Sequence, residues 1–292
     1  MGINKVILHI DLTKRLATTK SYDDIHKFVG GVGFASFLTK ERLDFDPVVF
    51  SVGPLNGFFP FVSKTCASFV EDFSFHDVYV GGKLSTRLQF SSFDAIVLEG
   101  SAKAPVVISI AGREVNFYNA STDPFSVGTP GKRCVMSVDS KHKQFLTDGV
   151  FAFGGNALSE KLQAKGVVAI TVSGTEETQT MLNPKYEKLY LEILSKVKML
   201  LIEPSNNASC SGCPMGCKDS KVGESGGDVF THCLVACKFA DPIYSDLSLV
   251  FACLNTLGYD YNHGDLENLP ILVNSTTNFI YEKLSNSKLE TK

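Results

Sequence analysis

The sequence has no excess of basic residues and no long apolar run. Lysine and arginine total 28 against 31 aspartates and glutamates, so the formal net charge is −3. That balance gives no positive field for nucleic acid or an anionic membrane, and we expect neither as a partner. No apolar stretch approaches the roughly 20 residues that span a bilayer. The N-terminal segment also lacks the features of a signal peptide, so we expect a cytoplasmic protein.

Cysteines are spread unevenly along a chain that has enough apolar residues to fold. Hydrophobic residues make up 44% and charged residues 20% of the 292 residues, which suits one large domain or two ordinary ones. Six of the eight cysteines fall between positions 210 and 253. A disulfide framework would distribute its bridges more evenly, and a reducing compartment keeps thiols free. The clustering therefore indicates free thiols or metal ligands.

The first 175 residues are dominated by short segments rich in Val, Ile and Phe, bounded by Gly, Pro, Ser or Asp. This pattern is typical of β-strands. Two helices are expected among them, at 22–40 and near 84–91. Because strands and helices do not strictly alternate, the sequence predicts an α+β domain. The expected strands are 6–10, 48–52, 67–71, 95–99, 106–111, 115–118, 134–138 and 167–172.

The pattern changes after a polar segment at 174–183, which we interpret as a linker. Pro184 suits a first helical turn, and apolar residues then recur at helical spacing. Further helices are expected near 228–240, 244–258 and 267–285. We therefore predict a β-rich domain over 1–175 and a smaller helical domain over 184–292.

A cysteine loop lies between the first two helical segments. Cys210, Cys213 and Cys217 form a Cys-x2-Cys-x3-Cys pattern, and Gly212 and Gly216 stand between them. This spacing lets one loop place several thiolates around a cubane cluster. The glycines allow the positive φ angles that such wrapping needs, and they let backbone N–H groups approach the sulfurs.

Three interpretations of the loop stay open: an iron–sulfur cluster, a structural zinc site and unligated thiols. Zinc sites usually combine two separate pairs of ligands, and the sequence has no second Cys-x2-Cys pair, which favours the cluster. A fourth ligand could come from Cys233, Cys237 or Cys253. Cys233 and Cys237 fall four residues apart on one predicted helix face, so either could face the loop. We interpret Cys253 as a small buried residue.

Several segments, in order over about 3–262, resemble the aldehyde ferredoxin oxidoreductase family. The stretch with the most matches is Leu-Gln-Phe-Ser-Ser-Phe-Asp-Ala-Ile-Val-Leu-Glu-Gly at 88–100. The other matching segments are Ile-Asp-Leu-Thr at 10–13, Phe-Val-Gly-Gly-Val-Gly at 28–33, Gly-Pro-Leu-Asn-Gly at 53–57, Gly-Gly-Lys-Leu at 81–84, Gly-Gly at 154–155, Gly-Val-Val-Ala-Ile-Thr-Val at 166–172 and Leu-Gly-Tyr-Asp at 257–260.

The resemblance implies a saddle-like β-rich domain that carries tungsten, or molybdenum, on two pterins beside a [4Fe–4S] cluster. The implied reaction oxidises an aldehyde to a carboxylate and passes electrons to ferredoxin or another carrier. The implied metal ligands are the three loop cysteines. The implied cofactor-binding residues are Lys64, Gly81, Gly82, Gly154, Gly155, Asn255 and Asp260.

The chain departs from the family pattern at several charged or donor positions. Tyr79 stands where an asparagine is usual, Phe153 where a basic residue is usual, and Asn255 where an aspartate is usual. Family members are also much longer, with a further helical domain. The expected function is therefore an oxidoreductase completed by a second chain, with the isolated chain inactive. The alternative is a non-catalytic electron-transfer or scaffold subunit. A homodimer is compatible with both.

Overall fold

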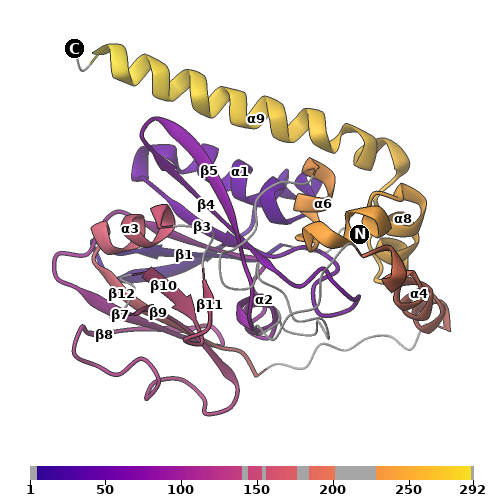
Figure 1. The fold of residues 1–292 in the computed structure, drawn as a ribbon. Helices are drawn as coiled ribbons and strands as arrows, with labels where there is room; N and C mark the ends of the chain where they lie inside the picture. The colour runs from indigo at the N-terminus through magenta and orange to yellow at the C-terminus, as the bar shows by residue number, and fades with distance from the viewer. Residues whose placement is uncertain (1–4, 140–143, 153–155, 176–183, 201–227, 291–292) are drawn as a thin grey trace.

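The computed structural model describes residues 5–139, 144–152, 156–175, 184–200 and 228–290 (Figure 1). The predicted α+β class is confirmed, because strands dominate the first part of the chain and helices the last part. The proposed boundary between two domains stays a prediction. Most of its linker, 176–183, lies outside the described residues.

A first six-stranded sheet has the order β2-β1-β6-β3-β4-β5. β1 is parallel to β6, and the other pairings are antiparallel. All five residues of β6 are buried, which explains why this strand is a continuous apolar run in the sequence. The strands are β1 (Ile7–Asp11), β2 (Leu16–Lys20), β3 (Val48–Ser51), β4 (Thr65–Glu71), β5 (Ser74–Val80) and β6 (Ala95–Glu99).

A second six-stranded sheet, of order β11-β10-β9-β12-β7-β8, packs against one face of the first. Apolar side chains of β1, β3, β4 and β6 share a buried cluster with those of β7, β9 and β12, and two helices, α2 and α3, add to it. Its strands are β7 (Val106–Ala111), β8 (Glu114–Asn119), β9 (Arg133–Asp139), β10 (Gln144–Thr147), β11 (Phe151–Ala152) and β12 (Val167–Ser173).

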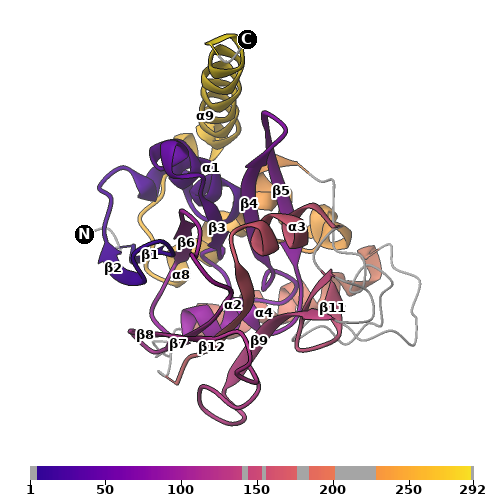
Figure 2. The same cartoon turned by 90° about the vertical axis from the view of Figure 1, so that its left-hand side faces the viewer.

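Helices cover the opposite face of the first sheet, where a second buried cluster joins α1, α6, α8 and α9 to β4 and β5. The longest helix, α9, crosses α1 and β5 and projects beyond them (Figures 1 and 2). The helices are α1 (Gly31–Glu41), α2 (Leu84–Gln89), α3 (Ala157–Ala164), α4 (Pro184–Ser195), α6 (Val229–Cys233), α7 (Asp241–Tyr244), α8 (Leu247–Thr256) and α9 (His263–Glu290), with 3₁₀ helices η1 (Ile25–Phe28), η2 (Leu43–Phe45), η3 (Lys196–Met199) and η4 (Lys238–Ala240).

The structure corrects two predicted helices and adds one. The helix expected at 22–40 is interrupted before α1, since Val29 and Gly31 have φ angles of 62° and 48°. The helix expected at 228–240 is split into α6 and η4. Sequence reasoning missed α3 and the strands β2, β5, β10 and β11.

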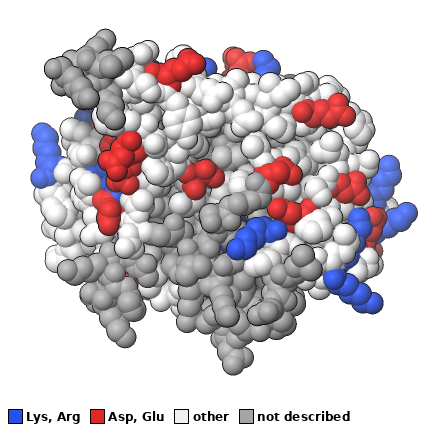
Figure 3. Space-filling view, turned by 45° about the horizontal axis from the view of Figure 1, so that its top comes forward, with Lys and Arg blue, Asp and Glu red and all other residues white. Residues whose placement is uncertain are grey.

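The surface of the described residues carries charges of both signs. On the face seen in Figure 3, acidic and basic side chains are scattered among uncharged ones. Among the helices that the structure describes, none combines the length and the apolar composition needed to cross a membrane.

Candidate functional site

Lys64 and Gly81 are neighbours at one end of the β4–β5 hairpin. Thr65 at the start of β4 pairs with Val80 at the end of β5. Lys64 comes directly before Thr65 and Gly81 directly after Val80, so the two lie at the same end of the hairpin. The Lys64 residue is only 3% exposed, and Gly81 and Gly82 are buried. A buried cation beside glycine backbone suits an anionic group such as a phosphate. The structure thus brings together three of the predicted cofactor-binding residues.

Gly82 has a conformation and surroundings that require glycine. Its φ angle is 78°, and a Cβ there would lie 2.8 Å from Cδ2 of Phe151 and 3.0 Å from Cγ2 of Thr147. Phe151 precedes Gly154 by three residues in the chain. Gly154 and Gly155, the second predicted glycine pair, lie outside the described residues. The contact therefore brings the segment that leads to this pair against the Gly81–Gly82 turn.

Tyr79 lies close to the same end of β5, and its side chain is buried. The ring centroid is 4.6 Å from that of His232 in α6, and the residue is 2% exposed. Burial raises the pKa of the Tyr79 phenol and of the neighbouring Cys66 thiol, and the nearby Asp77 carboxylate adds to both shifts. Both groups are therefore neutral near pH 7. A neutral aromatic ring thus occupies the position where the family pattern has an amide.

Two glycines of the first motifs make room for the backbone around the end of α6. A Cβ at Gly31 would lie 2.2 Å from the carbonyl oxygen of His232, and a Cβ at Gly53 would lie 2.2 Å from that of Leu234. These distances are far below van der Waals contact, so no other residue fits without movement. The two motif glycines therefore fix the position of the segment that follows the cysteine loop.

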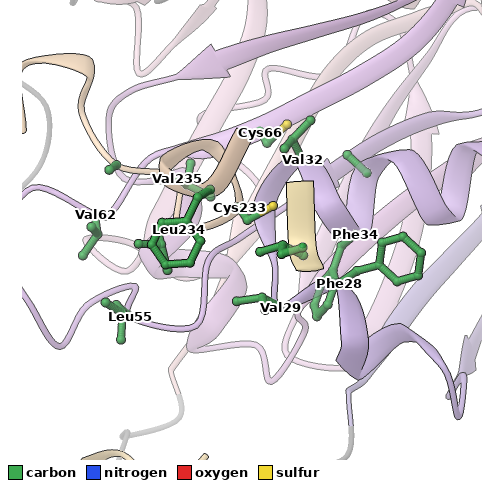
Figure 4. Close-up of a cluster of buried hydrophobic side chains, with 14 of the residues drawn as sticks. Phe28, Val29, Val32, Phe34, Leu55, Val62, Cys66, Cys233, Leu234 and Val235 are labelled. Atoms are coloured by element: carbon green, nitrogen blue, oxygen red, sulfur yellow. The ribbon is translucent and has the colours of Figure 1, made fainter. Parts of the chain in front are cut away.

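The prediction that Cys233 and Cys237 share one helix face is wrong. α6 ends at Cys233, and Val235 then takes a φ angle of 55°, which breaks the helical path. Figure 4 shows Cys233 in the buried cluster that also holds Cys66, and burial raises the pKa of the Cys233 thiol. Cys237 is half-buried, and its backbone N–H donates to the Phe61 carbonyl at 2.7 Å.

The predicted metal ligands Cys210, Cys213 and Cys217 lie outside the described residues. Among the residues that are described, no three His, Cys, Asp or Glu side chains gather as a metal site. Cys253 is buried in α8, where burial, with a smaller effect of Glu192, raises its thiol pKa to about 12.

Asn255 and Asp260 lie at a second place, around the end of α8. Asn255 is exposed in the last turn of the helix. Asp260 is exposed and lines a pocket of about 470 Å³ together with Lys5, Tyr22 and His26. Neither residue therefore belongs to the end of the β4–β5 hairpin that holds Lys64.

Sequence reasoning missed a partly buried ion pair between Lys5 and Asp94. Lys5 Nζ lies 3.1 Å from Oδ1 of Asp94, donates to the Tyr259 hydroxyl at 3.2 Å, and lies 4.7 Å from the centre of that ring. Burial is the largest single influence on the pKa of Lys5 and acts to lower it, but Asp94, Tyr259 and Tyr261 together outweigh it and the pKa is raised. Asp94 and Tyr259 fall within family-like segments, whereas only the fold reveals Lys5 as their partner.

Side chains of the helical region hold the loop that leads into Lys64. The Tyr186 hydroxyl of α4 donates to the Phe58 carbonyl, and the Tyr244 hydroxyl of α7 donates to the Pro60 carbonyl. The bond from Cys237 to Phe61 adds a third attachment. The conformation of the loop before Lys64 therefore depends on residues more than a hundred positions later.

Residues 7–128 match the family model of the aldehyde ferredoxin oxidoreductase N-terminal domain. Among solved structures, the chain is similar to the active site complex BamBC of benzoyl coenzyme A reductase, solved with 1,5-dienoyl-CoA, at a TM-score of 0.56 and 17% sequence identity. The similarity covers 71% of this chain and 37% of that chain, so the matched part spans little more than a third of the length of its structural relative.

Proposed function

From the premise that residues 7–128 form an aldehyde ferredoxin oxidoreductase N-terminal domain, we propose that the chain is one component of an oxidoreductase of that type. The family-model match is the observation that carries the proposal. The shared fold with the benzoyl coenzyme A reductase complex supports it, because that complex is also a reductase built from more than one kind of chain.

The hairpin end is the proposed holding point for one half of a pterin cofactor. Lys64 offers a cation, and Gly81 and Gly82 offer backbone that comes close to a ligand. These residues fit the anionic part of such a group, and Gly154 and Gly155 would complete the cradle. A tungsten or molybdenum ion on two pterins would supply two-electron chemistry, such as oxidation of an aldehyde to a carboxylate.

Electrons would leave through an iron–sulfur cluster held by Cys210, Cys213 and Cys217. For the fourth thiolate we favour Cys237 over Cys233. Cys237 is half-buried and lies beyond the end of α6, whereas Cys233 is fully buried in an apolar cluster. Ferredoxin or another small electron carrier would accept the electrons.

A second chain would supply the rest of the cofactor shell. The structural relative is itself a complex, BamBC, and a cofactor with several negative charges needs cations and donors on both sides. An incomplete site admits water, which weakens the electrostatics around the metal. We therefore expect the isolated chain to be inactive and a complex with its partner to be active.

Activity and cluster signals test the proposal together. Anaerobically purified chain would be assayed with several aldehydes and a viologen acceptor, alone and with proteins that co-purify with it. Electron paramagnetic resonance of the reduced chain should show a cluster signal that Cys213→Ala removes and Cys134→Ala, a control in the inter-sheet core, retains. Absence of any cluster signal, together with no turnover in any complex, would refute the proposal.

The burial of Tyr79 favours a second candidate, a subunit that keeps the cluster but not the metal-pterin. The ring packs on His232 and is 2% exposed, at a position where an amide donor would otherwise face the cofactor. A complex that contains iron but neither tungsten, molybdenum nor pterin fluorescence would support this electron-transfer or scaffold role over the catalytic one.

A further inference from the structure

A groove of about 600 Å³ opens near the N-terminal ends of α6, α8 and α9. We call it the α9 groove. Two exposed carboxylates line it, those of Asp228 and Glu267, and no basic residue of the described chain does. The groove therefore combines an apolar surface with negative charge. Its apolar residues are Val229, Phe230, Leu247, Leu266 and Pro270.

The two carboxylates of the groove are not neutralised by the part of the chain that the structure describes. Oδ1 of Asp228 caps α6 and accepts from the backbone N–H groups of Phe230 at 2.6 Å and Thr231 at 3.3 Å. Neither Asp228 nor Glu267 forms an ion pair with a described residue. An anionic, apolar groove is complementary to a surface that is cationic and apolar.

Such a surface is present on α4 and on η3, which follows it directly. Leu191 and Leu194 are three residues apart on the helix, so they share one side, and they are 56% and 37% exposed. Lys188 and Lys198 flank the two leucines, and both are exposed and without an ion pair in the described chain. Met199, 45% exposed, adds apolar area. These five residues form what we call the α4 face.

The α4 face is turned away from the contact that α4 makes within its own chain. Ile193, on another side of the helix, is the buried residue of α4 and belongs to the core cluster that also contains residues of α8. The face and the groove are nevertheless neighbours. Nζ of Lys196 in η3 lies 3.9 Å from Oδ2 of Asp246, which directly precedes Leu247 of the groove.

We propose that the chain forms a homodimer in which the α4 face of each copy docks in the α9 groove of the other. Two neighbouring surfaces that complement each other suit a two-fold axis, because one rotation makes the same contact twice and closes the assembly. The leucines of the face then pack on the apolar groove, and its lysines meet the two carboxylates. A contact of this kind has a dissociation constant in the micromolar range.

Analytical ultracentrifugation of the full-length chain over a concentration series measures this constant. Leu191→Asp places a charge in the apolar part of the contact, so we expect it to abolish the dimer. Leu16→Asp is the matched control, because Leu16 is 59% exposed on β2, in the edge strand of the first sheet, and lies outside both surfaces. Circular dichroism confirms that both variants fold.

Charge reversal tests how the two surfaces are paired. We expect Glu267→Lys in the groove, and separately Lys188→Glu with Lys198→Glu on the α4 face, to weaken the dimer at least about tenfold. Glu282→Lys, at an exposed position further along α9, is the control and should change nothing.

Mixing the two charge-reversed proteins should restore association to within about threefold of the wild-type constant. In the mixed dimer one contact is unaltered, and in the other the reversed charges meet each other. The proposal is overturned if the wild-type chain is monomeric throughout the series, if Leu191→Asp and Leu16→Asp behave alike, or if the mixture stays as weak as its components.

Discussion

Gly31 is the residue at which backbone conformation and tertiary packing are most strictly linked. Its φ angle is 48°, and a Cβ would meet the His232 carbonyl oxygen at 2.2 Å. Gly112, in the β7–β8 turn, also has a positive φ angle, of 57°, but nothing lies within 4 Å of the Cβ direction. A side chain at Gly31 would meet both a strained backbone conformation and a steric clash, whereas one at Gly112 would meet only the strained conformation.

We expect Gly31→Ala to lower the free energy of unfolding by at least about 3 kcal/mol and Gly112→Ala by only about 1 kcal/mol. Urea unfolding followed by circular dichroism measures both. Equal losses in the two variants would show that the α6 backbone moves away easily, and that Gly31 does not fix its position.

Glu99 is the centre of a buried polar network on β6. Its carboxylate accepts from Nδ1 of His9 at 2.7 Å and from two nitrogens of Arg42, each at 2.7 Å. Burial acts to raise the pKa of Glu99, but the bonds from His9 and Arg42 outweigh it and lower the pKa to about 2, against an ordinary value of 4.5. The stabilisation is therefore present above pH 4.5 and is lost as the pH falls towards 2.

We expect Glu99→Gln to lower the free energy of unfolding at pH 7 by about 2–3 kcal/mol and to flatten its decline between pH 4.5 and 2. Glu187→Gln, on the exposed side of α4, is the control and should follow the wild type. Unfolding curves measured at half-unit pH steps give the free energy of unfolding of each variant as a function of pH. Parallel pH profiles for wild type and Glu99→Gln would contradict the assigned network.

At the scale of elements, the helical region is attached to the β-rich part through the loop before Lys64. Tyr244 in α7 is buried, and its hydroxyl donates to the Pro60 carbonyl. Tyr281 in α9 makes a comparable bond to the Phe75 carbonyl, but it is 41% exposed. Water can replace the second bond and cannot reach the first.

Tyr244→Phe should therefore cost about 1–2 kcal/mol of stability, and Tyr281→Phe less than about 0.5 kcal/mol. Chemical denaturation of the two variants in parallel gives both numbers. If the two substitutions cost the same, the Tyr244 contact does not hold the loop in place.

All central strands except the short β10 could be predicted from the sequence, whereas most edge strands could not. β1, β3, β4, β6, β7, β9 and β12 are apolar runs because neighbouring layers bury them. β2, β5 and β11 are edge strands, and all five residues of β2 are exposed, so they lack the apolar pattern that marks a buried strand in the sequence. The edge strand β8 was found because Val115 and Phe117 pack on the inter-sheet core.

The residues of the candidate site also fall into two groups, those that a local sequence pattern indicates and those that only the fold reveals. Glycine pairs and cysteine spacing are local patterns, so Gly81, Gly82 and the cysteine loop could be named from sequence. Lys5 could not, because its role depends on residues brought to it by the fold: Lys5 lies 254 positions from Tyr259, its partner. The expectation that Cys233 and Cys237 share one helix face failed for the same reason, since tertiary packing ends α6 at Cys233.

At the scale of the whole molecule, the proposed function makes this chain one component of a larger redox enzyme. Its sheets and helices form two adjoining buried clusters, and the hairpin end and the α6 segment lie close together, as the Tyr79–His232 contact shows. This arrangement places α6, the segment that follows the cysteine loop, next to β5 of the first sheet, whereas Tyr186 of α4, before the loop, bonds to the loop after β3. The proposed function requires an iron–sulfur cluster at the cysteine loop.

Elemental analysis of anaerobically purified protein tests that claim most directly, with iron, acid-labile sulfide, zinc, tungsten and molybdenum measured on one sample. We expect about four iron and four sulfide per chain, lost in Cys213→Ala and kept in Cys134→Ala, with tungsten or molybdenum only where a second chain co-purifies. Stoichiometric zinc without iron, or a metal-free chain, would contradict it.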